Sequence, residues 1–328
     1  MWALRTWRKM PVSEERGWLS EYLFHGGGIY SGASDAVLLD AVEPFVRACQ
    51  ARGWIDRWFF IRYGERGPHV RLRLHGVRAV LEREAGHALR EHLAALYPGV
   101  AEGFPEQPSP AGGEGVSHVA TVPYEPETAR YGGPDGVLLA EEFFHLSSEA
   151  ALALLRGTRR GERSSRLGKA LLATVVLVHA FRGSRNGAGE FAHAYGTGYL
   201  RALVPDGERR EVLTRAFGGG FEQQAETLTA YVEEAWGRLD SGEPLSAALD
   251  RYRAGLEEVR ARFGALLDAG RLSQGGAVLT DRERAVAAIV SSYVHMMNNR
   301  LGVTIQEESY LAYLIHRSLG GAPAPAGA

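Results

Sequence analysis

The sequence predicts an α+β protein: a small antiparallel sheet of ferredoxin-like, or split βαβ, order followed by a mainly helical C-terminal half. Two observations carry this prediction. Arg57–Tyr63 and His69–His75 are typical of strands, and the turn-rich Gly64–Pro68 between them has the length of a hairpin loop. Beyond about residue 135 the apolar residues recur at helical spacing almost to the C-terminus.

The remaining N-terminal elements complete the split βαβ order. Trp18–Phe24 is short and aromatic, and the glycine turn after it marks the end of a strand. Apolar residues at helical spacing over Val37–Val46 predict a helix, with Asp35 near its start as the N-cap. A second helix over Ala79–Tyr97 and a strand over His118–Tyr124 follow.

The second half is predicted to be a set of helices packed on the sheet. They are expected at Val137–Leu155, Arg166–Arg182, Glu190–Leu203, Arg209–Leu239, Leu245–Leu267, Asp281–Asn298 and Glu307–Leu319. We therefore expect a sheet region over residues 1–134, a helical region over 135–319 and a disordered Gly/Ala/Pro tail over 320–328.

Composition excludes several classes of protein. The 328 residues are 45% hydrophobic and 23% charged, which is typical of a folded protein. The formal net charge of -2 provides no bulk positive field for nucleic acid. A single cysteine, Cys49, excludes an internal disulfide and suits a cytoplasmic location. We expect no membrane partner, because the apolar stretch Ala170–Val178 is far shorter than the roughly 20 residues that span a bilayer.

The second strand of the hairpin carries a row of cation-capable side chains. Its strict alternation places His69, Arg71, Arg73 and His75 on one face of the sheet and apolar residues on the other. One interpretation is a half-exposed sheet whose polar face meets water. The other is that a bound carboxylate or a protein acid offsets the charges, which makes Arg71 and Arg73 candidates for an anion clamp.

The segment after the last predicted strand is also polar. Glu125, Glu127, Arg130 and Tyr131 surround a strand exit that ends in Gly132-Gly133. Loops at such exits often hold functional side chains on a rigid base. An Arg/Glu pair that fastens the turn is an equally good interpretation.

The helix end Ser291–Arg300 supplies a titratable group. Ser291 and Asn298 or Asn299 share a helix face with His295, and Tyr293 lies beside them in the sequence. Histidine is the commonest general acid or base, because its ordinary pKa of about 6.5 is close to physiological pH. The alternative is a core histidine or a partner of the helix dipole. We expect this segment and the cationic sheet face to converge on one pocket.

Motifs of other familiar chemistry are missing from the sequence. It has no phosphate-binding P-loop, no His-Glu-x-x-His zinc helix and no G-x-S-x-G nucleophile elbow. His145, His179 and His193 are scattered singly on predicted helices. We therefore expect no metal site.

Several of these segments together resemble the C-terminal domain family of lantibiotic dehydratases, also called the thiopeptide-type bacteriocin biosynthesis domain. The matching motifs follow the family's order from about Trp18 to Leu319. They are Arg57–Tyr63 with Pro68–Arg73, Tyr124–Glu127 with Arg130–Gly133, Ala140–Phe144 with Ser147-Ser148, and His295-Met296 with Asn298–Leu301.

The resemblance implies an enzyme that matures a ribosomally made precursor peptide carrying a leader, without a cofactor. One activity is a formal [4+2] aza-cycloaddition of two dehydroalanines, followed by dehydration and leader elimination, which forms the central pyridine of a thiopeptide macrocycle. The other is elimination of glutamate from glutamylated Ser or Thr in a split tRNA-dependent dehydratase. The family's functional arginines and histidine correspond to Arg71, Arg73, Arg130 and His295.

No large glutamylation domain precedes this segment, which fits either activity, and the presence of Arg71, Arg73, Arg130 and His295 speaks for glutamate elimination. We favour the pyridine synthase, mainly on the free-standing length of the chain. The candidate catalytic residues are then His295, Tyr293 and Ser291. The candidate substrate-binding residues are Arg71, Arg73, Arg130, His69, Asn298 and Asn299. A third interpretation is a catalytically idle partner that holds the leader by strand addition or by helix-in-groove contacts. The sequence leaves open whether the protein is a monomer or a homodimer.

Overall fold

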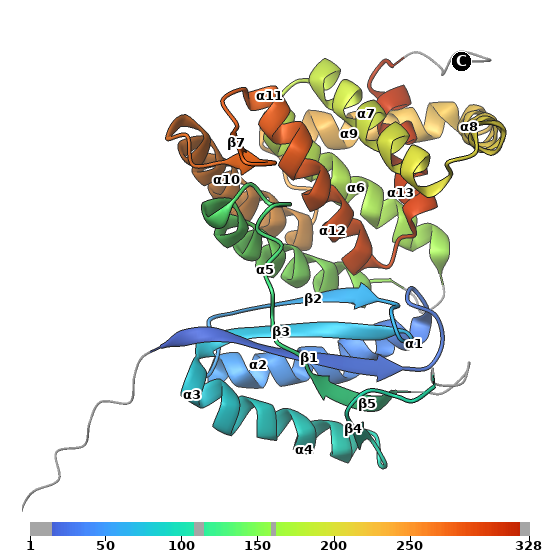
Figure 1. Cartoon of the computed structure of the whole chain (residues 1–328). Coiled ribbons are helices and arrows are strands. Elements are labelled where there is room, and N and C mark those ends of the chain that lie inside the picture. The colour runs from blue at the N-terminus through green and yellow to red at the C-terminus, as the bar shows by residue number, and fades with distance from the viewer. Residues whose placement is uncertain (1–14, 108–114, 159–161, 322–328) are drawn as a thin grey trace, which may run out of the picture.

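A computed structural model describes residues 15–107, 115–158 and 162–321, and it places a helical region above a sheet region (Figure 1). The sheet contains β1 (Arg16–His25), β2 (Arg57–Tyr63), β3 (His69–Val77), β4 (Ala101–Glu102) and β5 (Val116–Thr121). Its strand order is β2-β3-β1-β5-β4, with only the short β4 parallel to its neighbour. The first four strands of this order form the ferredoxin-like arrangement, so the predicted fold class is confirmed.

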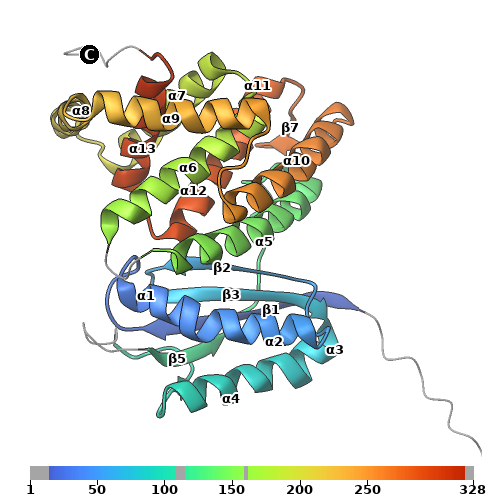
Figure 2. The same cartoon turned by 180° about the vertical axis from the view of Figure 1, so that it is seen from behind.

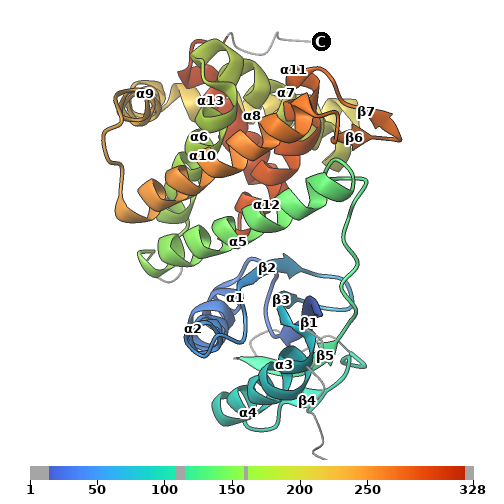
Figure 3. The ribbon, with the colours of Figure 1, turned by 90° about the vertical axis from the view of Figure 1, so that its left-hand side faces the viewer.

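Two helices with inner π-helical turns cover one face of the sheet (Figures 2 and 3). The first runs from α1 (Gly32–Ala36) through Val37–Val42 into α2 (Glu43–Ala51), and the second from α3 (Arg78–Val80) through Leu81–Ala85 into α4 (Gly86–Leu96). Val70, Leu72 and Leu74 of β3 are completely buried. The apolar side of β3 therefore meets the helices, as its alternation predicts.

None of the described helices covers the opposite face of the sheet. The chain after β5 runs along this side on its way up to α5, as Figure 3 shows with the sheet seen edge-on. This face carries the polar side of β3, which includes Arg71 and Arg73. The connecting segment and the cationic row are therefore brought together by the topology.

The C-terminal half consists of packed helices. They are α5 (Pro134–Arg156), α6 (Arg163–Arg182), α7 (Arg185–Leu203), α8 (Gly207–Glu222), α9 (Ala225–Ser241), α10 (Ala247–Asp268), α11 (Arg282–Ala285), α12 (Ser291–Leu301) and α13 (Ile305–Ser318), and a π-helical turn over Val286–Val290 joins α11 to α12. The prediction of one continuous helix over Arg209–Leu239 is wrong in one respect. Two helices occupy this range, because α8 ends before Gln223-Gln224 and α9 begins after them. The small hairpin of β6 (Ser273–Gln274) and β7 (Ala277–Val278) was not predicted.

The most apolar helix is α6. Among the helices that the structure describes, it alone has the length and composition to cross a membrane, and 56% of its apolar window is buried inside the protein. At the C-terminus, Gly320 and Gly321 still bond to α13, and the rest of the predicted disordered tail, residues 322–328, lies outside the described residues.

The outer edge of β2 is closed by side chains from the helices above it (Figure 1). Phe60 N donates to Ser148 Oγ of α5 at 3.2 Å. Arg62 N donates to Asn299 Oδ1 of α12 at 3.0 Å, and Asn299 Nδ2 donates to Arg62 O at 2.9 Å. The Asn299 side chain thus pairs with the backbone N–H and C=O of Arg62, as the backbone of a neighbouring strand would. Because a strand edge must be free to recruit another chain, this edge does not offer strand addition to a leader peptide.

A buried ion cluster joins the sheet region to the helical region. Asp35 of α1 accepts from Arg62 Nη2 at 2.7 Å, and both of its carboxylate oxygens bind Arg166 of α6. Arg62 Nε also donates to Arg300 O at 3.1 Å, and Arg166 Nη1 donates to Leu301 O at 3.0 Å. The two arginines therefore satisfy carbonyls at the C-terminal end of α12, where cations are favourable.

The prediction that Asp35 caps its own helix is wrong. The N-cap of α1 is Ser31, which makes no side-chain capping bond, and Asp35 lies inside the helix. Asp35 is 5% exposed, beside arginines that are 1% and 6% exposed. Its role is to neutralise these two buried cations, because a buried charge without a partner costs several kcal/mol.

We predict that Asp35→Asn strongly destabilises the fold. Burial alone would raise the pKa of Asp35, but hydrogen bonding from Arg166 and the charge of Arg62 outweigh burial and hold that pKa below its ordinary value of 3.8. The stabilisation is therefore present above pH 3.8 and lost as the pH falls through the lower pKa of the folded state. At pH 7 the substitution should lower the free energy of unfolding by about 3–5 kcal/mol.

Urea unfolding at pH 7 and at pH 3 measures this effect. The difference between Asp35→Asn and the unsubstituted protein should shrink at the lower pH. Asp268→Asn, at an exposed position at the end of α10, is the matched control and should change the free energy of unfolding by no more than about 0.5 kcal/mol. Equal stability of the two variants at pH 7 would contradict the prediction.

Candidate functional site

A cavity of about 350 Å³ lies on the helix-free face of the sheet. We call it the sheet cavity. Its charged lining residues are Arg71 and Arg73 from β3 and Glu125 and Glu127 from the segment after β5. Its aromatic lining residues are Tyr22, Phe59, Tyr124, Tyr131 and Phe144. The cationic row and the polar segment that follows the last strand of the sheet therefore meet around one hollow.

Arg73 is the least satisfied cation in this cavity. It is 6% exposed, and burial lowers the pKa of its guanidinium. Its Cζ lies 5.2 Å from the ring centroid of Tyr124 and 5.4 Å from that of Tyr22. Within the described part of the chain, Nε and Nη1 of Arg73 have no hydrogen-bond partner. Because unpaired buried donors are costly, this side chain is suited to bind an anion or a carbonyl oxygen of a ligand.

Arg71 is held by its neighbours. Its Cζ lies 3.5 Å from the ring centroid of Tyr63 and 4.7 Å from that of Tyr22. Its Nη2 is 3.7 Å from a carboxylate oxygen of the exposed Glu65, and its Nε donates to His69 Nε2 at 3.2 Å. Arg71 therefore lines the cavity with a guanidinium that already interacts with two tyrosines, a carboxylate and a histidine of the protein.

The two histidines of the row have partners in the protein. Nδ1 of His69 lies 2.8 Å from Gly67 O, and burial lowers the pKa of His69 to about 4. His69 is therefore neutral at pH 7, and it accepts from Arg71 instead of facing the cavity. His75 lies at the far end of the row, where its Nδ1 is 2.6 Å from Asp56 Oδ1. The row of four cations is thus reduced to its two arginines.

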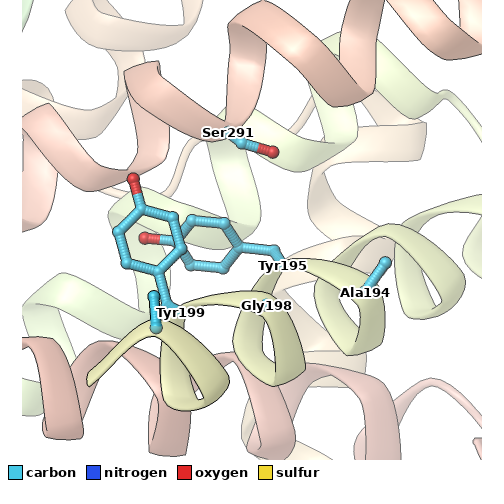
Figure 4. Close-up of a pocket in the computed structure, with 6 residues that line it drawn as sticks. Ala194, Tyr195, Gly198, Tyr199 and Ser291 are labelled. Atoms are coloured by element: carbon cyan, nitrogen blue, oxygen red, sulfur yellow. The ribbon is translucent and has the colours of Figure 1, made fainter. Parts of the chain in front are cut away.

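A second hollow, of about 280 Å³, lies between α7 and α12. We call it the helix cavity. Figure 4 shows Tyr195 and Tyr199 of α7 on one side and Ser291 of α12 across from them. The Ser291 hydroxyl donates to Ala287 O at 2.7 Å, one helical turn earlier. Ser291 is therefore a wall residue of this hollow, as the sequence prediction of a site at this helix end requires.

His295 lies one turn after Ser291 and beside the helix cavity. Its ring centroid is 5.2 Å from that of Tyr199, and its side chain is 15% exposed. Its Nδ1 is 3.0 and 3.1 Å from the two carboxylate oxygens of Glu308 in α13. Glu308 is fully buried and also accepts from the Tyr195 hydroxyl at 2.6 Å. Burial raises the pKa of Glu308, and the hydrogen bond from His295 opposes that shift.

Arg130 lies between the two cavities. Its Nη1 is 3.1 Å from Glu127 Oε2, and its Nε donates to Ser292 Oγ at 3.1 Å. Burial raises the pKa of Tyr199, and a hydrogen bond with Arg130 opposes this rise. The single pocket expected from the sequence is replaced by two hollows, and Arg130 interacts with one lining residue of each, Glu127 in the sheet cavity and Tyr199 in the helix cavity.

Three other sequence-predicted residues are engaged inside the protein. Tyr293 is completely buried, its ring lies 4.2 Å from that of Phe143 in a stacked arrangement, and its hydroxyl has no hydrogen-bond partner among the described residues. Asn299 is bound to the backbone of β2. Asn298 is 1% exposed and lies next to the Tyr195 hydroxyl.

Sequence reasoning missed Tyr195, Tyr199 and Glu308. The two tyrosines are one turn apart on α7, which gives a helix face but not the helix opposite it. A signal for Glu308 is present in the sequence, because it stands in the buried stripe of α13 with Leu311 and Ile315. An acid in an apolar stripe needs a partner, so it marks a buried polar site.

In residues 15–107, 115–158 and 162–321, no cluster of three or more His, Cys, Asp or Glu residues could hold a metal ion. The scattered histidines have separate partners. Nδ1 of His145 is 3.0 Å from Trp58 O, and Nε2 of His179 is 3.0 Å from Asp240 Oδ1. The charged and titratable groups at the two cavities include Arg71, Arg73, two tyrosines of α7 and the His295–Glu308 pair.

The fold has close counterparts among solved structures. The crystal structure of TsrL is 20% identical, with a TM-score of 0.66 over 93% of this chain and 94% of that one. TbtD, the pyridine synthase from thiomuracin biosynthesis, is 22% identical, with a TM-score of 0.64 over 93% and 98%. The tRNA-dependent lantibiotic dehydratase MibB from Microbispora sp. 107891 is 22% identical, with a TM-score of 0.64 over 92% of this chain and 28% of that one. At these identities the likeness concerns the fold.

No curated protein matches the sequence. A protein family does match it: residues 18–319 correspond to the family described as lantibiotic biosynthesis dehydratase C-term. This match spans both the sheet region and the helical region, and it confirms the resemblance indicated by the sequence motifs. The chain belongs to the lantibiotic biosynthesis dehydratase C-terminal family.

Proposed function

We propose that this protein is a pyridine synthase that acts on a dehydrated, leader-bearing precursor peptide. The imidic tautomer of an amide together with one dehydroalanine forms the azadiene, and a second dehydroalanine adds across it. Two C–C bonds form, one from the alkene CH2 of the azadiene and one from its imidic carbon, while the amide nitrogen keeps the two bonds it already has. The hydroxyl on the former amide carbon then leaves as water, and the leader leaves as a carboxamide so that the ring becomes a pyridine. The observation that carries this proposal is the sheet cavity, in which a buried arginine with unpaired N–H groups faces aromatic walls.

The aromatic walls suit a reaction that depends on orientation. Tyr22, Phe59 and Tyr124 present flat surfaces against which two alkenes can be aligned. Holding two reacting groups in the correct geometry can supply about 7–11 kcal/mol of the barrier reduction. Glu125 and Glu127 line the same cavity and would repel a departing glutamate. The charge and the shape of the cavity therefore favour cyclisation over glutamate release.

The polar groups supply the proton and charge chemistry. The free N–H groups of Arg73 stabilise negative charge on the amide oxygen that is later lost as water. His295, whose Nδ1 is bound to Glu308, moves protons to and from the amide nitrogen and the ring. The peptide spans both cavities, with Arg130 at the boundary between them.

A glutamate-eliminating lyase is the second candidate. The same unpaired guanidinium of Arg73 suits the carboxylate of a leaving glutamate. The fold likeness to MibB, a tRNA-dependent lantibiotic dehydratase, is compatible with that activity.

Mass spectrometry on two substrates tests the proposed reaction. We expect the purified protein to convert a dehydrated, azole-bearing precursor into a pyridine macrocycle and to release the leader as a carboxamide. A glutamylated precursor should stay unchanged. Release of free glutamate with no cyclisation would establish the lyase instead. Binding of the leader with no mass change in either peptide would establish the non-catalytic partner.

We predict that Arg73→Met lowers kcat/KM by about 100-fold or more, because removing one oxyanion-type donor costs that much in other enzymes. The Nε and Nη1 donors have no partner in the described part of the fold, but the guanidinium also interacts with Tyr22 and Tyr124, so we expect a loss of only about 1 kcal/mol in the free energy of unfolding, which urea unfolding measures. The control is Arg66→Met, because Arg66 is exposed on the β2–β3 turn and stacks on Phe104. Equal kcat/KM values for the two variants would show that Arg73 takes no part in the reaction.

We predict that Tyr293→Phe keeps the turnover of the unsubstituted protein. Its hydroxyl is buried without a partner, so its removal leaves both the reaction and the stability intact. His295→Ala should lower kcat by about 100- to 10,000-fold while the leader affinity stays unchanged. Steady-state kinetics and fluorescence anisotropy with a labelled leader measure the two effects. A large loss of kcat in Tyr293→Phe would show that the hydroxyl takes part in catalysis.

A further inference from the structure

We propose that Glu308 is the positioning residue that fixes the tautomer and the ring orientation of His295. Nδ1–H then points at Glu308, and Nε2 is the nitrogen that exchanges protons with the substrate. This inference rests on the proposed function, because it assigns a partner to the histidine that the reaction uses.

The contacts of Glu308 determine where the protons lie. Nδ1 of His295 is 3.1 Å from Oε1 and 3.0 Å from Oε2, and the Tyr195 hydroxyl donates to Oε2 at 2.6 Å. A carboxylate that receives a tyrosine hydroxyl and an imidazole nitrogen acts as an acceptor toward both. The imidazole therefore carries its hydrogen on Nδ1, and the ring plane is set by two oxygens on one side.

Glu308 is not needed for the local structure of α13. The neighbouring Glu307 forms the capping box with Thr304 and pairs with Arg163. Glu308 instead lies fully buried, where a charge costs several kcal/mol unless it is well paired. The partner of Glu308 is His295, which lies at the edge of the helix cavity. A buried carboxylate bound to a histidine in this way can orient the imidazole for proton transfer.

Other charged and titratable groups surround this pair. Tyr195 and Tyr199 face it from α7, and Arg130 faces it from the segment after β5, with its charge favouring the carboxylate of Glu308. Tyr30 in the β1–α1 loop is close enough for the charge of Glu308 to raise its pKa, although burial is the larger cause.

Glu308→Gln tests the proposal, with Glu307→Gln as the matched control one residue away. In Glu308→Gln we expect kcat to fall roughly 10- to 100-fold, less than the loss of the whole acid–base group would cost. KM should change by less than about twofold, since the histidine is affected and the binding cavity is not.

Nitrogen NMR of ¹⁵N-histidine-labelled protein measures positioning without any turnover. His295, assigned by comparison with His295→Ala, should show the Nδ1–H tautomer in the unsubstituted protein and lose that preference in Glu308→Gln. In the Glu307→Gln control the signals should stay in place. Glu308→Asp, which keeps the charge, should restore part of kcat and the tautomer. Circular dichroism at the assay temperature confirms that each variant is folded.

Two results would overturn the proposal. The first is a His295 tautomer that is the same in Glu308→Gln and in the unsubstituted protein. The second is a double variant, His295→Ala with Glu308→Gln, that is clearly slower than His295→Ala alone, because a residue acting only through His295 adds no further loss. Failure of the proposed function itself gives a different pattern: the tautomer responds to Glu308→Gln, but no pyridine forms with any variant.

Discussion

The pairing of Asp35 with Arg62 and Arg166 is the interaction on which the rest of the site depends. It brings together α1, the edge strand β2, α6 and the last carbonyls of α12 in one buried cluster. Because α12 is a continuous helix, fixing its C-terminal end also fixes His295 and Ser291 further up the same helix. The charge cluster therefore sets how His295 of the helical region is placed relative to the arginines of the sheet.

The same cluster explains why β2 binds helices instead of another strand. Asn299 lies next to Arg300, whose carbonyl Arg62 holds, and from this position it makes two hydrogen bonds to the β2 backbone. With that edge closed, the open surface left to the sheet region is its helix-free face. The segment after β5 then borders this face and, through Arg130, joins it to the cavity between α7 and α12.

Sequence periodicity predicted the fold class and the face that each β3 side chain occupies, because a strand alternates regardless of its neighbours. It could not predict which groups lie opposite. Asp35 has the position of a cap, yet arginines far away in the sequence recruit it. Tyr293 follows the spacing of the candidate site but lies in the core, since α5 and α6 pack on its side of α12. Glu308 went unassigned because its partner belongs to another helix.

The distribution of charge on β3 shows why a single side chain carries so much of the site. His75 is bound to Asp56, His69 is neutral, and Arg71 is shared among tyrosines and Glu65, so three of the four cation-capable groups are satisfied within the protein. Among the described residues that line the aromatic cavity, Arg73 is the cation whose Nε and Nη1 have no hydrogen-bond partner. In such a low-dielectric setting an unpaired donor interacts more strongly with a developing charge than it would in water. The fold thus leaves a partly unpaired guanidinium in the wall of a cavity.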